Sequence, residues 1–132
     1  MTPTNLISVL FDTSVLVEIL RGNETLFAQF SDYAMFIPSV AVGELYYGAY
    51  KSANPAKHEA QIQRLIEKGK LLPVNHHTGR LFGLIRRQLE LKSNRIPEND
   101  IWIAAIAVQY ELPLVTRDHH FQAVDGLQVM LW

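Results

Sequence analysis

Short apolar runs alternate with longer segments whose apolar residues recur at helical spacing. The runs rich in β-forming residues lie at positions 7–11, 35–37, 71–74, 112–115 and 127–131. Between them, the periodicity predicts helices over positions 15–20, 25–33, 40–50, 55–70, 75–91 and 97–108. Strands that alternate with helices in this way indicate a parallel sheet flanked by helices. We therefore expect an α/β/α sandwich with a mainly parallel central sheet, formed by residues 1–132 as a single domain.

The predicted helix over positions 97–108 is unusual because it is almost entirely apolar. Pro97 suits the first turn of a helix, and the eight residues that follow Asp100 carry no charge. This segment is too short to span a membrane and fits a helix enclosed by protein. Asp100 therefore stands where solvent meets the core. The simplest interpretation is that it complements the helix dipole, but other acids occupy comparable places.

Three further acids lie at the ends of strands or in apolar helices. Asp12 directly follows the first strand, and Asp118 follows the fourth after only two residues. Glu44 is the only charge in the helix predicted over positions 40–50. Each has an alternative explanation, since Asp12 could be a helix cap and Glu44 could lie on a narrow exposed stripe.

Ligands of open α/β sheets bind beyond the carboxyl ends of the strands, so these four acids can converge at one edge. Carboxylates that converge repel one another unless a cation neutralises them, and oxygen ligands favour Mg²⁺ or Mn²⁺. Such an ion supports hydrolysis of a phosphodiester by an activated water. The histidine pairs at 76–77 and 119–120 are not ready chelates, and we expect surface or tuning roles for them, with His119 or His120 near the pocket.

Composition excludes several other classes of protein. The chain has no cysteine, which excludes a disulfide framework, a thiolate zinc site and a cysteine nucleophile. Its net charge of −1 neither indicates nor excludes nucleic acid as a partner. Asp12 and Glu18 interrupt the apolar run over positions 6–20, and no signal peptide is recognisable, so we expect a cytoplasmic protein without a membrane span.

Five segments, taken in order, resemble the PIN-domain ribonucleases and more closely the VapC-type toxins of bacterial type II toxin–antitoxin pairs. They are F-D-T-S at 11–14, V-G-E-L-Y-Y-G at 42–48, I-P-E-N-D-I-W-I-A-A at 96–105, L-V-T-R-D-H-H-F at 114–121 and V-D-G-L at 124–127. Each segment alone is a weak signal, but the ordered set covers most of the chain and is quite specific. The resemblance implies a PIN-like domain and an endoribonuclease that depends on Mg²⁺ or Mn²⁺.

The resemblance also implies a set of site residues and partners. The catalytic and metal-holding acids are Asp12, Glu44, Asp100 and Asp118, of which Asp118 is the least uniform among such proteins. Thr116 and Thr13 are the supporting hydrogen-bond donors. Apart from the resemblance, the basic residues Arg86, Arg87, Arg117 and Lys51 are candidate RNA contacts. The expected partners are an RNA substrate, a cognate antitoxin protein and a second copy of the chain in a homodimer.

Two alternatives from other functional classes stay open on the sequence. A receiver-type signalling domain has similar length and an acidic Mg²⁺ pocket, but it needs an acidic neighbour beside Asp12 and a lysine after a late strand, which this sequence does not supply. A non-catalytic RNA-binding module could have kept the fold, although all four acids remain in place. Discrimination between these alternatives requires the geometry of the four acids.

Overall fold

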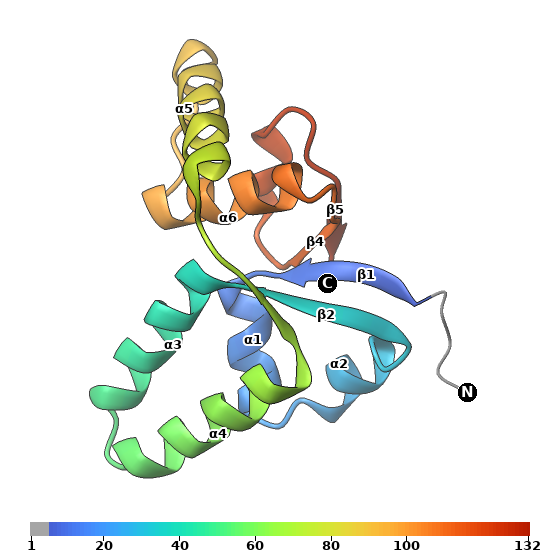
Figure 1. Cartoon of the computed structure of the whole chain (residues 1–132), viewed down its shortest axis with the longest axis vertical. Helices are drawn as coiled ribbons and strands as arrows, with labels where there is room; N and C mark the ends of the chain where they lie inside the picture. Colours follow the sequence, from blue (N-terminus) through green and yellow to red (C-terminus); the bar gives the residue numbers. More distant parts are fainter. Residues whose placement is uncertain (1–5) are drawn as a thin grey trace.

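The computed structural model describes residues 6–132, in which strands and helices alternate (Figure 1). The strands are β1 (Ile7–Phe11), β2 (Tyr33–Pro38), β3 (Lys70–Leu72), β4 (Leu114–Thr116) and β5 (Val129–Leu131). The helices are α1 (Thr13–Leu20), α2 (Glu24–Gln29), α3 (Ser39–Tyr50), α4 (Pro55–Lys68), α5 (His76–Leu91) and α6 (Glu98–Gln109), together with a 3₁₀ helix, η1 (His119–Ala123). Within these residues no helix is long and apolar enough to cross a membrane.

The five strands form one sheet in the order β3-β2-β1-β4-β5, and every neighbouring pair is parallel. From β1 the chain proceeds to β2 and β3 on one side, and it then returns to place β4 and β5 on the other side. The order of the strands therefore reverses between β1 and β4. In open α/β sheets this switch point is where ligands bind.

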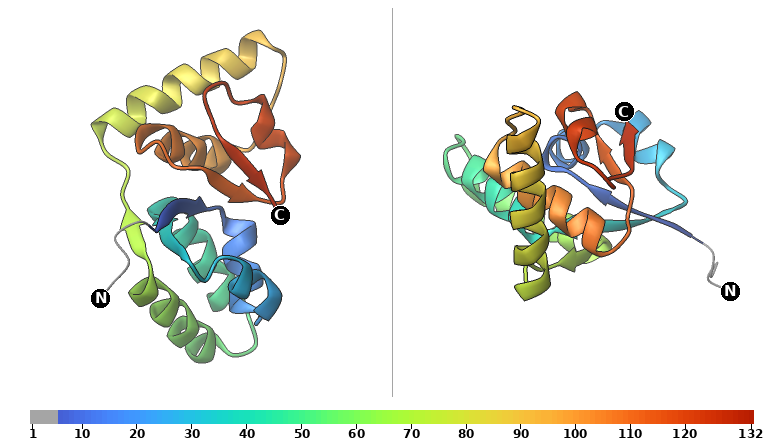
Figure 2. Two further views of the ribbon diagram at one scale, coloured as in Figure 1. Left: turned by 90° about the vertical axis from the view of Figure 1, so that its right-hand side faces the viewer. Right: turned by 90° about the horizontal axis from the view of Figure 1, so that it is seen from above.

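Helices cover both sides of the sheet, which confirms the predicted α/β/α fold. Figures 1 and 2 show α1 to α4 on one side of β1 and β2, and α5 and α6 on the other. The central strand is enclosed from both sides, since Val9 and Leu10 are fully buried. The predicted apolar helix is α6, in which Ile103, Ala104 and Ile106 are also fully buried. Burial of apolar surface of this kind is the main force that stabilises the fold.

Three helices end in the same capping motif, in which a residue in the left-handed conformation follows the last turn. These residues are Gly22 after α1, Ser93 after α5 and Glu111 after α6, with φ angles of 84°, 54° and 53°. After α5, the N–H of Ser93 donates to the carbonyl of Glu90 at 3.0 Å and the N–H of Asn94 to that of Leu89 at 2.9 Å. Only one of the three positions carries a glycine.

Several predicted boundaries differ from the structure. The second helix was predicted over positions 25–33, but α2 ends at Gln29 because Tyr33 pairs with Ile7 and begins β2. The third strand was predicted over positions 71–74, whereas β3 ends at Leu72 before Pro73, which has no N–H to donate to a ladder. The fourth and fifth strands contain three residues each and are shorter than predicted, and η1 was not predicted at all.

Candidate active site at the switch point

Asp12 lies at the carboxyl end of β1 and begins α1. One of its oxygens accepts hydrogen bonds from the backbone N–H of Val15 at 3.1 Å and from the hydroxyl of Ser14 at 2.7 Å. The residue is 4% exposed. Asp12 is therefore the helix cap that the sequence allowed as an alternative. Its second oxygen faces β4.

Thr116 connects Asp12 to the next strand of the sheet. It is the last residue of β4 and is fully buried. Its hydroxyl donates to the second oxygen of Asp12 and accepts a hydrogen bond from the backbone N–H of Asp118 at 2.9 Å. One hydroxyl thus sets the positions of two acids that follow neighbouring strands.

Glu44 reaches the same region from α3 and is half-buried. The hydroxyl of Thr13 donates to its carboxylate at 3.2 Å. Burial raises the pKa of Glu44, and the negative charges of Asp100 and Asp12 raise it further, although the hydrogen bond from Thr13 acts in the opposite direction. Glu44 is therefore within electrostatic range of both acids.

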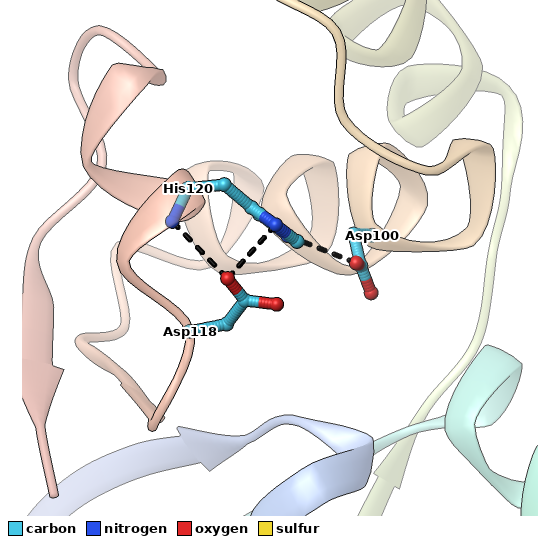
Figure 3. A group of neighbouring side chains, drawn as sticks. All are labelled: Asp100, Asp118 and His120. Atoms are coloured by element: carbon cyan, nitrogen blue, oxygen red, sulfur yellow. Dashed lines mark hydrogen bonds and ion pairs between the residues drawn. The ribbon is translucent and has the colours of Figure 1, made fainter.

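Asp100 lies in the first turn of α6 and faces His120, as Figure 3 shows. Its carboxylate is 3.0 Å from Nε2 of that histidine. Burial raises the pKa of Asp100, and His120 lowers it, whereas the charges of Asp12 and Asp118 raise it again. The net direction of the pKa shift is upward, with burial as its main cause and the neighbouring acids as a smaller one.

Asp118 caps η1 and holds His120 in place. Its Oδ1 accepts from the backbone N–H of His120 at 3.2 Å and lies 2.8 Å from Nδ1 of the same residue. The imidazole therefore lies between the carboxylates of Asp100 and Asp118 (Figure 3). His119 points to an exposed position instead. The sequence analysis did not decide which of the two histidines lies near the site. The Asp-x-His spacing was the signal for His120, because a turn capped by Asp returns the second following residue to the carboxylate.

The donor chemistry of this cluster fits a divalent cation. One ligand atom from each of Asp100, Asp118 and His120 lies within 4.8 Å of the other two. Asp12 and Glu44 adjoin this group and act electrostatically on Asp100 or on each other. Several carboxylates at one place repel one another, and a divalent cation such as Mg²⁺ or Mn²⁺ reduces that repulsion.

The four candidate RNA contacts come from three separate parts of the chain and all have partners. The pairs are Arg86 with Glu98 at 3.8 Å, Arg87 with Glu90 at 3.5 Å, Arg117 with Glu18 at 3.7 Å, and Lys51 over the ring of Tyr47 at 4.9 Å. The guanidinium of Arg117 also stacks on the ring of Trp132 at 3.7 Å. Exposed ion pairs are weak, so these basic side chains can leave their partners and contact a phosphate instead.

Comparison with known proteins gives consistent matches over almost the whole chain. The family described as PIN domain matches residues 9–127. Ribonuclease VapC2 of Haemophilus influenzae is 30% identical over 131 residues, which are 96% of this chain and 99% of that protein. Ribonuclease VapC5 of Mycobacterium tuberculosis is 31% identical over 118 residues, which are 87% and 86% of the two chains. Among solved structures, DNA-bound VapBC from Salmonella typhimurium matches with a TM-score of 0.86 and 25% identity, over 97% of this chain and 99% of that one.

Proposed function

Since this chain belongs to the PIN-domain family, and within it to the VapC ribonucleases, we propose that it is an endoribonuclease that acts as the toxin of a toxin–antitoxin pair. The reaction is hydrolysis of RNA phosphodiester bonds in the cytoplasm. The observation that carries this proposal is the meeting of four acids, from four separate segments, at the switch point between β1 and β4. The acids are Asp12, Glu44, Asp100 and Asp118.

We infer that these four acids hold Mg²⁺ or Mn²⁺. Such an ion, when bound, polarises a phosphoryl oxygen and lowers the pKa of a water so that it can attack at neutral pH. The chain itself supplies the negative charge and its orientation. Thr116 and Ser14 hold Asp12 in one rotamer, and Thr13 orients Glu44. Side chains fixed in this way lose little freedom when a substrate binds, which favours catalysis.

The partners follow from the family and remain proposals for this chain. A solved neighbour, VapBC-5 from Mycobacterium tuberculosis, is described as a member of the VapBC family of toxin–antitoxin systems, which supports a cognate antitoxin. We also propose a homodimer and propose that phosphates of the RNA contact Arg86, Arg87, Arg117 and Lys51. The receiver-type alternative has no support, because the matched relatives are ribonucleases and Asp12 has no acidic neighbour. A non-catalytic RNA-binding module is the alternative that the following experiment tests.

The test compares the wild type with Asp100→Asn and with Glu98→Gln on total cellular RNA. Both variants remove one negative charge from the first turn of α6, but Glu98 is exposed and pairs with Arg86 outside the cluster. New RNA ends are mapped by sequencing in Mg²⁺, in Mn²⁺ and in a chelator. We expect Asp100→Asn to lower the cleavage rate by about 100-fold or more, as the loss of one electrostatic group at a reacting centre does.

Glu98→Gln should cut at nearly the wild-type rate and at the same positions, and both variants should keep the wild-type circular dichroism. RNA cleavage by Asp100→Asn at the wild-type rate would contradict the assignment of the site. Equal activity in the chelator would contradict the proposed metal. Absence of cleavage by all three proteins, with RNA still bound, would favour the binding module.

A further inference from the structure

His120 is placed where a ligand to an ion in this site would be. Its side chain is 26% exposed, and each of its ring nitrogens faces a carboxylate, with Nε2 at 3.0 Å from Asp100 and Nδ1 at 2.8 Å from Asp118. Within residues 6–132, this histidine and these two acids form the group whose donor atoms are close enough to share one metal ion. Figure 3 shows that the imidazole points into the gap between the two acids.

The two nitrogens of His120 have different surroundings. Oδ1 of Asp118 accepts a hydrogen bond from the backbone N–H of His120 and lies 2.8 Å from Nδ1 of the ring. Asp118 thus holds the ring in one orientation. Nε2 then faces Asp100, an acid of the proposed metal site. Histidines that bind metals almost always donate their other ring N–H to a carboxylate, a backbone carbonyl or a water, which fixes the tautomer and makes the ligating nitrogen more basic. Asp118 supplies that carboxylate and keeps its second oxygen for the ion.

We propose that Nε2 of His120 is a ligand of the divalent ion and that it makes this site bind Mn²⁺ in preference to Mg²⁺. This inference rests on the proposed function, because it concerns the same ion. Mg²⁺ selects oxygen ligands and waters. Mn²⁺ takes the same oxygen ligands but, as a first-row transition metal, accepts an imidazole nitrogen more readily than Mg²⁺ does. A site built from carboxylates alone lacks this discrimination. His120 is thus a residue that determines metal specificity.

The experiment measures binding of Mn²⁺ and of Mg²⁺ separately, by calorimetry, to the wild type, His120→Asn and His119→Asn. Asparagine offers an amide oxygen, which Mg²⁺ accepts, but no imidazole nitrogen. His119 is the matched control because it is exposed in the same 3₁₀ helix. We expect His120→Asn to weaken Mn²⁺ binding by about tenfold or more and to leave Mg²⁺ binding nearly unchanged, while His119→Asn changes neither.

A spectroscopic measurement gives a direct readout. Electron spin echo envelope modulation spectroscopy of the Mn²⁺ complex detects a coordinated ¹⁴N nucleus. We expect this signal in the wild type and in His119→Asn, and its loss in His120→Asn.

The outcomes separate this inference from the proposed function. Equal weakening of both ions by His120→Asn would show that His120 only positions the carboxylates, and unchanged binding would show that it has no role in metal binding. Either result, or a wild-type spectrum without nitrogen, overturns the inference and leaves the ribonuclease proposal intact. Failure of the wild type to bind either ion overturns the proposed metal dependence as well.

Discussion

At the scale of single residues, the site depends on a hydroxyl as much as on its acids. Thr116 is fully buried and bonds to both Asp12 and Asp118, which come from different strand ends. Among residues 6–132, no buried side-chain nitrogen or oxygen lacks a hydrogen-bond partner. Asp12 is therefore buried with its charge satisfied by fixed donors, and those donors also set its direction. Loss of one donor would leave a buried carboxylate oxygen without a hydrogen-bond partner, which lowers the stability of the fold.

Thr116→Val tests this role because valine has nearly the same shape and no hydroxyl. We expect the variant to lose about 1–3 kcal/mol of folding free energy, since a buried carboxylate oxygen and a partly buried N–H each lose a partner. RNA cleavage should fall by about tenfold or more as Asp12 and Asp118 lose their common anchor. Denaturant unfolding and cleavage rates measure the two effects, and Thr116→Ser should restore most of both.

Thr78→Val is the matched control for that prediction. Thr78 is equally buried and hydrogen-bonds to Asn75 and Gln109, but it lies at the start of α5 and not among the acids. We expect a similar loss of stability with a cleavage rate close to that of the wild type at a temperature where both variants are folded. A parallel loss of activity in Thr78→Val would show that instability alone explains the effect of Thr116→Val.

At the scale of elements, periodicity predicted the fold because each strand and helix carries its own pattern. The helix that contains Asp100 was recognisable from its apolar run, and the strands that precede Asp12 and Asp118 from their β-branched and aromatic residues. The four acids could therefore be assigned to one edge of the sheet. The place of His120 could not be predicted from periodicity, because η1 has no apolar period and exists through the cap that Asp118 provides, and its signal was the Asp-x-His spacing instead. Boundaries such as the end of α2 depend on pairing with a distant strand, which local sequence does not encode.

The capping motifs after the helices give a prediction at this scale. Ser93 and Glu111 adopt left-handed φ angles that disfavour residues with a Cβ atom, whereas Gly22 adopts the same conformation without that penalty. We expect Ser93→Gly and Glu111→Gly each to stabilise the fold by about 1 kcal/mol, and Gly22→Ala to destabilise it by a similar amount. Thermal and denaturant unfolding measure all three. Destabilisation by both glycine variants would show that the side chains contribute more than the strain costs.

At the scale of the whole molecule, the sheet order brings together the acids that the proposed function requires, and their burial and mutual repulsion oppose folding. Burial and neighbouring charges raise the pKa of both Glu44 and Asp100 in the folded chain. The folded state therefore holds more protons than the unfolded state at pH values just above the ordinary pKa values of 4.5 and 3.8. Since protons favour the state that binds them more strongly, these two groups lower stability as the pH rises through that interval.

This linkage predicts that activity and stability oppose each other at the site. In a chelator at pH 7, Asp100→Asn should unfold at a higher temperature than the wild type, because it removes a charge that the folded state disfavours. The difference should shrink as the pH is lowered toward the ordinary pKa of 3.8, and it should be smallest below that value, where the wild-type carboxyl is protonated in both states. Thermal scans from pH 3 to pH 8 measure it, with Glu98→Gln as the control. An Asp100→Asn variant less stable than the wild type at pH 7 would contradict the raised pKa.

The hydrogen bond between Thr116 and Asp12 joins residues 104 positions apart, and this separation has a consequence for synthesis of the protein. At translation rates of about 5–20 residues per second, roughly 5 to 20 seconds pass between the appearance of Asp12 and that of Thr116. During that interval the nascent chain has no complete site. Fragments released by premature termination before β4 have none either. Under the proposed function, only chains translated past Asp118 hold the complete set of four acids, so shorter fragments should not cleave RNA.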